Sequence, residues 1–286
     1  MQQKQSTIEE YRKRINIIVE YVNNHLDENI DLEKLAGLSH FSTFHFHRIA
    51  KAFLGEPIGM FIMRTRVETA ARFIRYSNVP IREIAYMVGY DAPSSLSKAF
   101  RQFYGVSPNY YRKNKNFVIM KSVNVRPELV LDQKEVNLKD KQVLYIRLTG
   151  DYLKNAYCEA WEKLWKFTAD KKLIIRNPEF LCIYHDDPKV TKSENLRTDV
   201  CLTFEGNVDP QGEIGLKNIE GGRYVVFLYK GPYEHLSAVY DTIYGKCLPE
   251  NGYSIASKPG FEKYLNNPSD TLPEDLETEI YVPVEK

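Results

Sequence analysis

The sequence predicts an α+β chain of two domains: an all-helical domain over residues 1–115, a linker over 116–126 and an α+β domain over 127–286. Through the first segment apolar residues recur every three or four positions, which is typical of amphipathic helices. After Pro127 the pattern changes to short runs rich in β-branched and aromatic residues, which favour strands. Each half also contains an internal repeat, so we expect both domains to be built from two similar units.

The composition limits the class of protein. Hydrophobic residues make up 43% of the chain and charged residues 27%, as in ordinary globular proteins. The polar N-terminus does not resemble a signal peptide, and no apolar run approaches the roughly 20 residues of a membrane span. We therefore expect a cytoplasmic protein without a membrane partner. The four cysteines include no CxxC pair, which predicts structural thiols, and we expect neither a metal site nor a cofactor.

Charge is divided unevenly along the chain, although the net charge is only +1. Basic residues outnumber acidic ones in residues 1–115, and acidic residues outnumber basic ones in residues 127–286. This division favours a polyanionic partner for the helical domain and a separate task for the second domain.

Two stretches of the helical domain follow one pattern. Residues 35–55 align with residues 84–105 after one extra residue in the second copy, and the copies end at Gly55 and Gly105. Between them, residues 58–76 are a predicted helix that would span roughly 28 Å at ~1.5 Å per residue. Successive major grooves lie ~34 Å apart, so this spacer could deliver two recognition helices to adjacent grooves. The pattern therefore predicts two helix-turn-helix elements that bind double-stranded DNA.

The most specific part of this pattern is the string AYMVGYDAPSSLSKAFRQFYGVSPNYYRK. With it, residues 8–113 resemble the AraC-type DNA-binding domain. The resemblance implies base-reading side chains in both recognition helices, at Phe44, His47, Arg48, Pro93, Ser94 and Lys98. Relatives often carry a long amide or an arginine in the second set, whereas Pro93 and Ser94 are short. Lys98 could donate to guanine or to a phosphate, and the sequence leaves both alternatives open.

The second domain is predicted to be α+β with an antiparallel sheet. The predicted strands cover 143–149, 180–184, 199–204, 224–229 and 279–284, and the predicted helices cover 155–169 and 235–247. Three blocks recur at an offset of 80 or 81 residues, which we interpret as a tandem duplication of a strand-helix-strand unit with a pseudo-twofold relation. The repeat places Asp199 and Glu279 at equivalent positions within strands.

Glu279 is the candidate ligand anchor. Alternation along its strand puts Glu279 and Tyr281 on one face, and a carboxylate within an apolar strand is costly unless it is exposed or paired. A solvent-facing sheet or a basic partner would also explain it. The density of aromatic residues favours a site for a flat or bulky, amphipathic and often cationic ligand. The candidate ligand-binding residues are Glu279, Tyr281, Tyr145, Trp161 and Tyr264.

The segments GPYEHLSAVY, FEKYLNNPSDTLPEDLETEIYVPV and, more weakly, LRTDVCLTF carry a second resemblance. With them, residues 127–286 resemble the GyrI-like effector-binding domain of multidrug-sensing regulators. This resemblance implies a small-molecule effector and places Glu279 at the floor of the ligand cavity. An AraC-type reader followed by such a domain is a Rob-like architecture, which implies a transcription regulator, an activator, with RNA polymerase as a further candidate partner.

Two other functions fit the second domain. Some GyrI-like proteins resemble hydrolases that use a glutamate and a tyrosine, roles that Glu279 with Tyr281 or Tyr264 could fill. The domain could instead bind a protein partner. Fusion to a DNA reader favours sensing, and no nucleophile constellation is visible, so we expect no enzyme activity.

Overall fold

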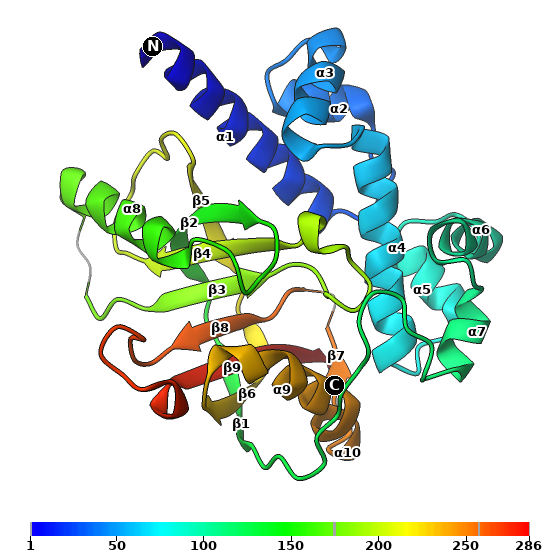
Figure 1. Ribbon diagram of the computed structural model, residues 1–286. Helices are drawn as coiled ribbons and strands as arrows, with labels where there is room; N and C mark the ends of the chain where they lie inside the picture. Colours follow the sequence, from blue (N-terminus) through cyan, green and yellow to red (C-terminus); the bar gives the residue numbers. More distant parts are fainter. Residues whose placement is uncertain (1, 174–175, 257, 286) are drawn as a thin grey trace. The chain divides into compact units, whose positions relative to one another are not determined.

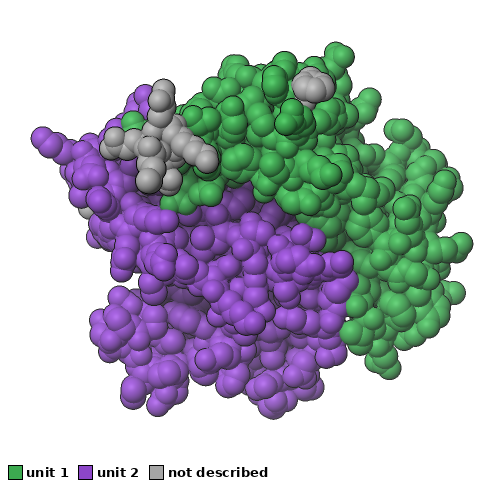
Figure 2. Space-filling view, turned by 45° about the horizontal axis from the view of Figure 1, so that its top comes forward, with its two compact units in different colours: residues 1–119, 211–213 green, residues 120–210, 214–286 purple. Residues whose placement is uncertain are grey.

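The computed structural model describes residues 2–173, 176–256 and 258–285, apart from the side chains of residues 2–6 and Phe44 (Figure 1). The chain divides into two compact units (Figure 2). Unit 1 comprises residues 1–119 and 211–213, and unit 2 comprises residues 120–210 and 214–286. The division after Ile119 falls within the predicted linker. In the described part of the chain, no helix is both long and apolar enough to cross a membrane.

Unit 1 is helical. Its helices are α1 (Gln2–Asn24), α2 (Leu32–Leu38), α3 (Thr43–Leu54), α4 (Ile58–Tyr76), α5 (Ile81–Met87), α6 (Pro93–Tyr104) and α7 (Pro108–Lys113). The side chain of Asp31 caps α2 by accepting the Glu33 amide, and that of Ser42 caps α3 by accepting the His45 amide. These caps satisfy amides that have no partner within their own helix, so they fix where each helix begins.

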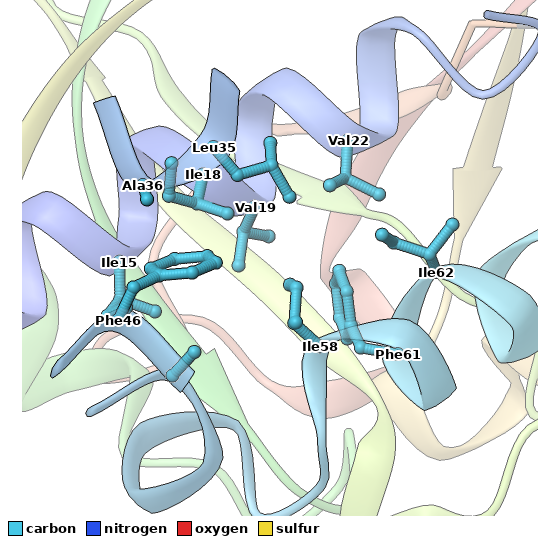
Figure 3. Close-up of a cluster of buried hydrophobic side chains, with 11 residues drawn as sticks. Ile15, Ile18, Val19, Val22, Leu35, Ala36, Phe46, Ile58, Phe61 and Ile62 are labelled. Atoms are coloured by element: carbon cyan, nitrogen blue, oxygen red, sulfur yellow. The ribbon is translucent and has the colours of Figure 1, made fainter. Parts of the chain in front are cut away.

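The core of the first helix-turn-helix is a set of apolar side chains from four helices (Figure 3). Ile18 and Val22 of α1 meet Leu35 of α2, Phe46 of α3 and Phe61 of α4, and all five are at most 2% exposed. Helix α4 lies between the two helix-turn-helix elements and contacts α3 on one side and α5 and α6 on the other (Figure 1). Since both elements pack on one helix, their spacing is set by that helix.

The two helix-turn-helix elements also repeat in backbone conformation. Gly55 and Gly105 end α3 and α6 with φ of 76° and 75°. At the preceding turn, His40 has φ 52° where the second element has Gly89 with φ 78°. Positive φ is cheap for glycine and strained for other residues, so the second copy has the less strained turn.

Unit 2 is one antiparallel sheet with helices. The strands are β1 (Asp132–Leu138), β2 (Lys141–Thr149), β3 (Phe180–Tyr184), β4 (Arg197–Thr203), β5 (Ile214–Ile219), β6 (Gly222–Lys230), β7 (Ser254–Ile255), β8 (Phe261–Tyr264) and β9 (Glu277–Glu285). The helices are α8 (Tyr157–Asp170), α9 (Leu236–Thr242), which continues through a π-helical turn (Ile243–Cys247), and α10 (Leu248–Glu250). Short 3-10 turns cover Ser193–Asn195, Tyr233–His235 and Pro273–Asp275.

The sheet order is β1-β6-β9-β8-β3-β4-β2-β5, and β7 pairs with β9. The units β2-α8-β3-β4 and β6-α9-β8-β9 are the two predicted copies, and they meet at the central pair β3 and β8. The sequence did not predict strands β1 and β5. Strand β1 immediately precedes the first copy but pairs with β6 of the second, and β5 immediately precedes the second copy but pairs with β2 of the first. Each copy therefore lends an edge strand to the other.

Alternation gives the sheet two distinct faces. The helix face carries Val200, Cys182, Glu262 and Ile280, which are neighbours across β4, β3, β8 and β9. Leu144, Val200 and Leu202 on this face pack with Ala160, Leu164 and Phe167 of α8. The reverse face carries Asp199, Ile183, Phe261 and Tyr281 in the same order of strands. A side chain therefore belongs to one face or the other according to its place in the strand.

Candidate functional site

Helix α3 presents two of the predicted DNA-reading side chains to solvent. His47 and Arg48 are exposed, whereas Phe46 is fully buried in the core. The side chain of Phe44, the third predicted reader in this helix, lies outside the described part of the structure. The buried side of α3 fixes its orientation, which leaves Arg48 with its guanidinium available for a base or a phosphate.

Helix α6 presents a second set. Ser94 and Lys98 are exposed and four residues apart, so they lie on one side of the helix. Leu96 and Phe100 point the other way and are fully buried. Pro93 is half-buried at the first turn, where its fixed φ suits a helix start, so its place is explained by helix initiation alone.

Other arginines of unit 1 make structural contacts within the unit. Arg64 pairs with Glu56 at 2.7 Å and Glu68 at 3.0 Å, and its side chain is 7% exposed. Arg66 donates to the carbonyl oxygens of Leu26 at 3.1 Å and Glu28 at 2.6 Å. The sequence does not distinguish these side chains from phosphate-binding ones. The partners of Arg66 lie 40 and 38 residues away along the chain, and the pairs of Arg64 are formed where α4 is buried.

The structure divides the predicted ligand residues instead of collecting them into one site. Glu279, Tyr281 and Tyr145 lie on the reverse face, and Trp161 and Tyr264 lie on the helix side of the sheet. Tyr145 and Glu279 are moreover separated by three intervening strands, which is about 19 Å at ~4.8 Å per strand. The structure therefore corrects the expectation that these five residues line one cavity around Glu279, because strand alternation puts them on opposite faces of the sheet.

Glu279 has partners of its own on the reverse face. The Tyr281 hydroxyl donates to it at 2.7 Å and the Lys134 ammonium at 3.0 Å. Burial alone would raise the pKa of Glu279, but these two hydrogen bonds hold it below its usual value. Glu279 thus has the basic partner that the sequence allowed as an alternative.

Asp199, the counterpart of Glu279 in the first copy, is fully buried. Arg147 binds it with two hydrogen bonds of 2.7 Å, His185 contacts it at 2.7 Å, and the Lys217 ammonium is also bound to it. Burial works against ionisation here, yet these cations hold the pKa of Asp199 well below its usual range. Tyr145 is 3% exposed beneath the same Lys217, whose ammonium lies 4.3 Å from the ring centre. This region is a buried ion cluster around one carboxylate.

A different carboxyl lies on the helix face. Glu262 in β8 is 1% exposed, and the Tyr264 hydroxyl donates to it at 2.6 Å. The Tyr184 hydroxyl lies 3.0 Å from that of Tyr264. Tyr240 of α9 also lies near the Glu262 carboxyl and helps to lower its pKa. Three tyrosines from β3, β8 and α9 therefore surround one buried acid.

Further aromatic rings extend this arrangement, which we call the Glu262 cluster. Its members are Glu262, Tyr152, Tyr157, Trp161, Tyr184, Tyr233, Tyr240 and Tyr264. The Trp161 and Tyr233 rings lie 5.5 Å and 5.4 Å from the Tyr264 ring, both nearly edge-on. All the rings of the cluster are half-buried, whereas the carboxyl beneath them is not accessible. The cluster is thus an aromatic surface over a single buried acid.

Burial raises the pKa of Glu262 to about 7, although hydrogen bonds from Tyr264, Tyr240 and Tyr184 counteract part of this effect. Since the acid is desolvated and has no cation among these partners, it is ready to pair with a cation from outside. Sequence reasoning did not select Glu262. The available signal was an acidic residue between aromatic ones in the short segment FEKY.

Known protein families match both units of the chain. A model of the GyrI-like small molecule binding domain matches residues 133–285, and a helix-turn-helix domain model of the AraC type matches residues 35–114. The transcriptional regulator Rob of Salmonella typhimurium is 23% identical, over 93% of this chain and 96% of its own.

Two solved structures resemble the fold. The EcmrR–DNA complex, determined by cryo-electron microscopy, is 16% identical with a TM-score of 0.49 and covers 90% of this chain and 100% of its own. A hydrolase from Listeria innocua is 16% identical with a TM-score of 0.41 and covers 54% of this chain and 91% of its own.

The paired helix-turn-helix unit and the duplicated sheet unit define a DNA-binding transcriptional regulator of the AraC type. The chain belongs to the family of the GyrI-like small molecule binding domain, joined here to that DNA-binding unit in the Rob-like architecture.

Proposed function

We propose that this regulator binds a small amphipathic cation at the Glu262 cluster and that the bound ligand changes its action on DNA. The observation that carries the proposal is the buried Glu262 carboxyl beneath half-buried aromatic rings. A desolvated carboxylate attracts a cation strongly, and aromatic faces add cation–π attraction of about 0.5–2 kcal/mol each. Together they favour ligands that carry one positive charge on an aromatic body.

For unit 1 we propose the exposed side chains of α3 and α6 as the DNA contacts. Arg48 and His47 would read bases from the first helix, and Lys98 and Ser94 would act from the second, with Pro93 setting the start of that helix. Phe44 remains a proposed contact by its position in α3. The AraC-type architecture also supports activation as the mode of action, with RNA polymerase as a partner.

Tetraphenylphosphonium, a cation with four aromatic rings, is a suitable probe for the ligand site. Binding to the full chain can be followed by quenching of tryptophan fluorescence, because Trp161 belongs to the cluster. Triphenylphosphine oxide serves as the neutral aromatic probe. Glu262→Gln should weaken binding of the cation at least about tenfold, the equivalent of 1.4 kcal/mol, and change binding of the neutral probe much less.

Glu279→Gln is the matched control, since it neutralises a carboxylate of the same unit on the reverse face. It should leave the affinity for tetraphenylphosphonium within about twofold of the wild type, because screened charges on the other side of a sheet contribute little. If Glu279→Gln lost more affinity for tetraphenylphosphonium than Glu262→Gln, Glu279 would be the anchor instead of Glu262. Equal losses for both probes in Glu262→Gln would contradict a charge-based site.

One observation also supports a second candidate function, hydrolysis. A carboxyl with a pKa of about 7 and a tyrosine at 2.6 Å, here Glu262 with Tyr264, is a suitable general acid–base pair at neutral pH. Incubation with p-nitrophenyl acetate tests this role. Product formation that Glu262→Gln and Tyr264→Phe abolish would favour an enzyme, and equal background rates for all three proteins would favour a sensor.

A further inference from the structure

The chain that joins the two units is held by hydrogen bonds on both sides of the division. In unit 1, Arg75 donates to the carbonyl oxygens of Lys115 at 2.5 Å and Phe117 at 2.7 Å. In unit 2, the Met120 amide donates to the carbonyl oxygen of Lys189 at 2.9 Å. Two residues separate the last of these bonds in unit 1 from the first in unit 2. The covalent path from one hydrogen-bonded segment to the other is therefore short.

Residues 120–127, which we call the connector, lie on helix α9. The Asn124 amide donates to Oδ2 of Asp241 at 2.7 Å, and the Arg126 amide donates to Oγ1 of Thr242 at 3.0 Å. Asp241 is 3% exposed and Thr242 is fully buried. Two adjacent buried side chains of α9 thus supply the acceptors that hold the connector.

The π-helical turn after α9 extends this docking. The Lys246 ammonium donates to the carbonyl oxygen of Pro127 at 2.6 Å. Val125 packs against Gly245 so closely that a Cβ at that glycine would lie 2.6 Å from the valine Cγ2. A side chain at Gly245 would push the connector away, so the sequence is matched to a docked connector.

The same helix forms one side of the Glu262 cluster. Tyr240 lies near Glu262 and helps to lower its pKa, and the next residue, Asp241, accepts from the connector. Successive residues of an α-helix point about 100° apart, so one turn of α9 faces both the cluster and the connector. A displacement of Tyr240 is thereby transmitted to the acceptors of the connector.

The first copy reaches the same place by another path. The Tyr152 hydroxyl of the cluster donates to the carbonyl oxygen of Asp186 at 2.8 Å. Three residues later, the Lys189 ammonium pairs with Asp241 at 3.0 Å. Both members of this pair are buried, and the Lys189 carbonyl accepts the Met120 amide. Contacts from both sides of the cluster therefore converge on one buried ion pair.

A cavity of about 460 Å³ lies beside this pair. Lys121, Asn124 and Arg126 of the connector line it together with Lys189 and Asp241. The connector thus has space next to it and is not packed against protein along its whole length.

We propose that the Lys189–Asp241 pair couples ligand occupancy of the Glu262 cluster to the connector, and through the connector to the DNA-binding unit. The coupling rests on the proposed ligand site. A ligand that inserts among the rings displaces Tyr240 and Tyr152 and shifts α9 against the Lys189 turn. The connector amides then lose their acceptors, which releases the constraint on the segment that follows α7 and is held by Arg75 of α4.

Hydrogen exchange of the full chain, read by mass spectrometry with and without tetraphenylphosphonium, tests this coupling. In the wild type the probe should accelerate exchange in residues 120–127 by roughly tenfold or more, because local opening sets the exchange rate. Asp241→Asn should exchange fast there without the probe and respond little to it. Glu250→Gln, which neutralises an exposed carboxylate of α10, should behave as the wild type. Thr242→Val removes a neighbouring acceptor if Asp241→Asn does not fold.

DNA affinity gives a second readout. The probe should bind Asp241→Asn at least as tightly as the wild type, because the variant has already lost the connector contacts that the ligand would break. Its effect on DNA affinity, about 5–150-fold for a typical coupling, should approach onefold in the variant. Two results would overturn the inference without affecting the proposed ligand site. One is a wild type that binds the probe with no change in exchange of the connector, and the other is Asp241→Asn with the full effect of the probe on DNA affinity. Failure of the probe to bind the wild type would instead remove the ligand site, and the coupling with it.

Discussion

Cys182 and Glu262 lie directly opposite each other on the central strands β3 and β8 and are 80 residues apart in the chain. The same spacing separates Tyr184 from Tyr264, whose hydroxyls meet at 3.0 Å. The duplication thus places a thiol and a carboxyl at equivalent positions on the helix face. A symmetric site would carry two carboxyls or none, whereas this one has a single acid at its centre, which suits a ligand with one positive charge.

Glu262→Gln should change how stability depends on pH. Burial raises the pKa of Glu262 from 4.5 to about 7, so the folded protein keeps a proton that the unfolded chain releases in this interval. This contribution to the free energy of unfolding is fully present below pH 4.5 and is lost as the pH rises through 7. Between pH 4.5 and 8 the wild type should lose about 3 kcal/mol relative to the variant.

Urea unfolding at several pH values, followed by tryptophan fluorescence, measures this difference. Both tryptophans lie in unit 2, so the signal reports on the domain that contains Glu262. If the stabilities of wild type and variant ran parallel from pH 4.5 to 8, Glu262 would not titrate as described.

The same ionisation should make binding of a cation depend on pH. Below pH 7 the Glu262 carboxyl must release its proton before it can pair with tetraphenylphosphonium. The affinity should therefore rise by about tenfold per pH unit up to pH 7 and level off above it. Calorimetric titrations in two buffers of different ionisation enthalpy should detect the released proton. An equal rise for neutral triphenylphosphine oxide would point to a different titrating group.

Local sequence patterns were sufficient to predict the elements with a strong apolar period. The spacer helix expected over 58–76 is α4, and the strand expected over 180–184 is β3. Strand β1 was missed because its sequence, DQKEVNL, is mostly exposed and lacks a buried face that would reveal alternation. Its position at the edge of the second copy depends on the pairing of β1 with β6, and no local sequence pattern predicts that pairing.

The proposed ligand anchor shows the same limit. The sequence favours Glu279 because it lies in a nine-residue strand with clear alternation, whereas the strand of Glu262 has four residues. A four-residue strand is too short to show a period. The partners of Glu262 come from β3 and α9, so its environment follows from strand pairing. Trp161 and Tyr264, which aromatic density predicts as ligand residues, lie together on the helix side of the sheet and stay a prediction.

Gly89→Ala should destabilise unit 1 far more than Gly105→Ala, although the two glycines have nearly equal φ. At Gly105 a Cβ would meet nothing within 4 Å, so only the strain of positive φ remains, about 1 kcal/mol. At Gly89 a Cβ would overlap the Leu26 carbonyl oxygen, which itself accepts from Arg66. That substitution should cost about 3 kcal/mol or more. Thermal unfolding followed at 222 nm compares them, and equal losses would contradict the close approach.

Arg48→Ala and Lys98→Ala should separate base reading from phosphate binding. Both side chains are exposed on their recognition helices, but Arg48 can bind guanine with two hydrogen bonds, while Lys98 offers a single ammonium. Arg48→Ala should weaken binding to a duplex selected from a randomised pool by about 1–3 kcal/mol and abolish preference at one position. Lys98→Ala should weaken all sequences similarly and reduce the slope of log affinity against log salt by about 0.9.

Repeating the selection with each variant distinguishes the two roles, because a base contact changes which sequence is selected and a phosphate contact changes only how tightly it is held. Unchanged affinity of Arg48→Ala for the selected duplex would exclude Arg48 as a reader. Loss of preference at one position in Lys98→Ala would make the second helix a base reader despite the short Pro93 and Ser94. In that case both grooves contribute to specificity, and the fixed length of α4 sets the spacing between the two half-sites.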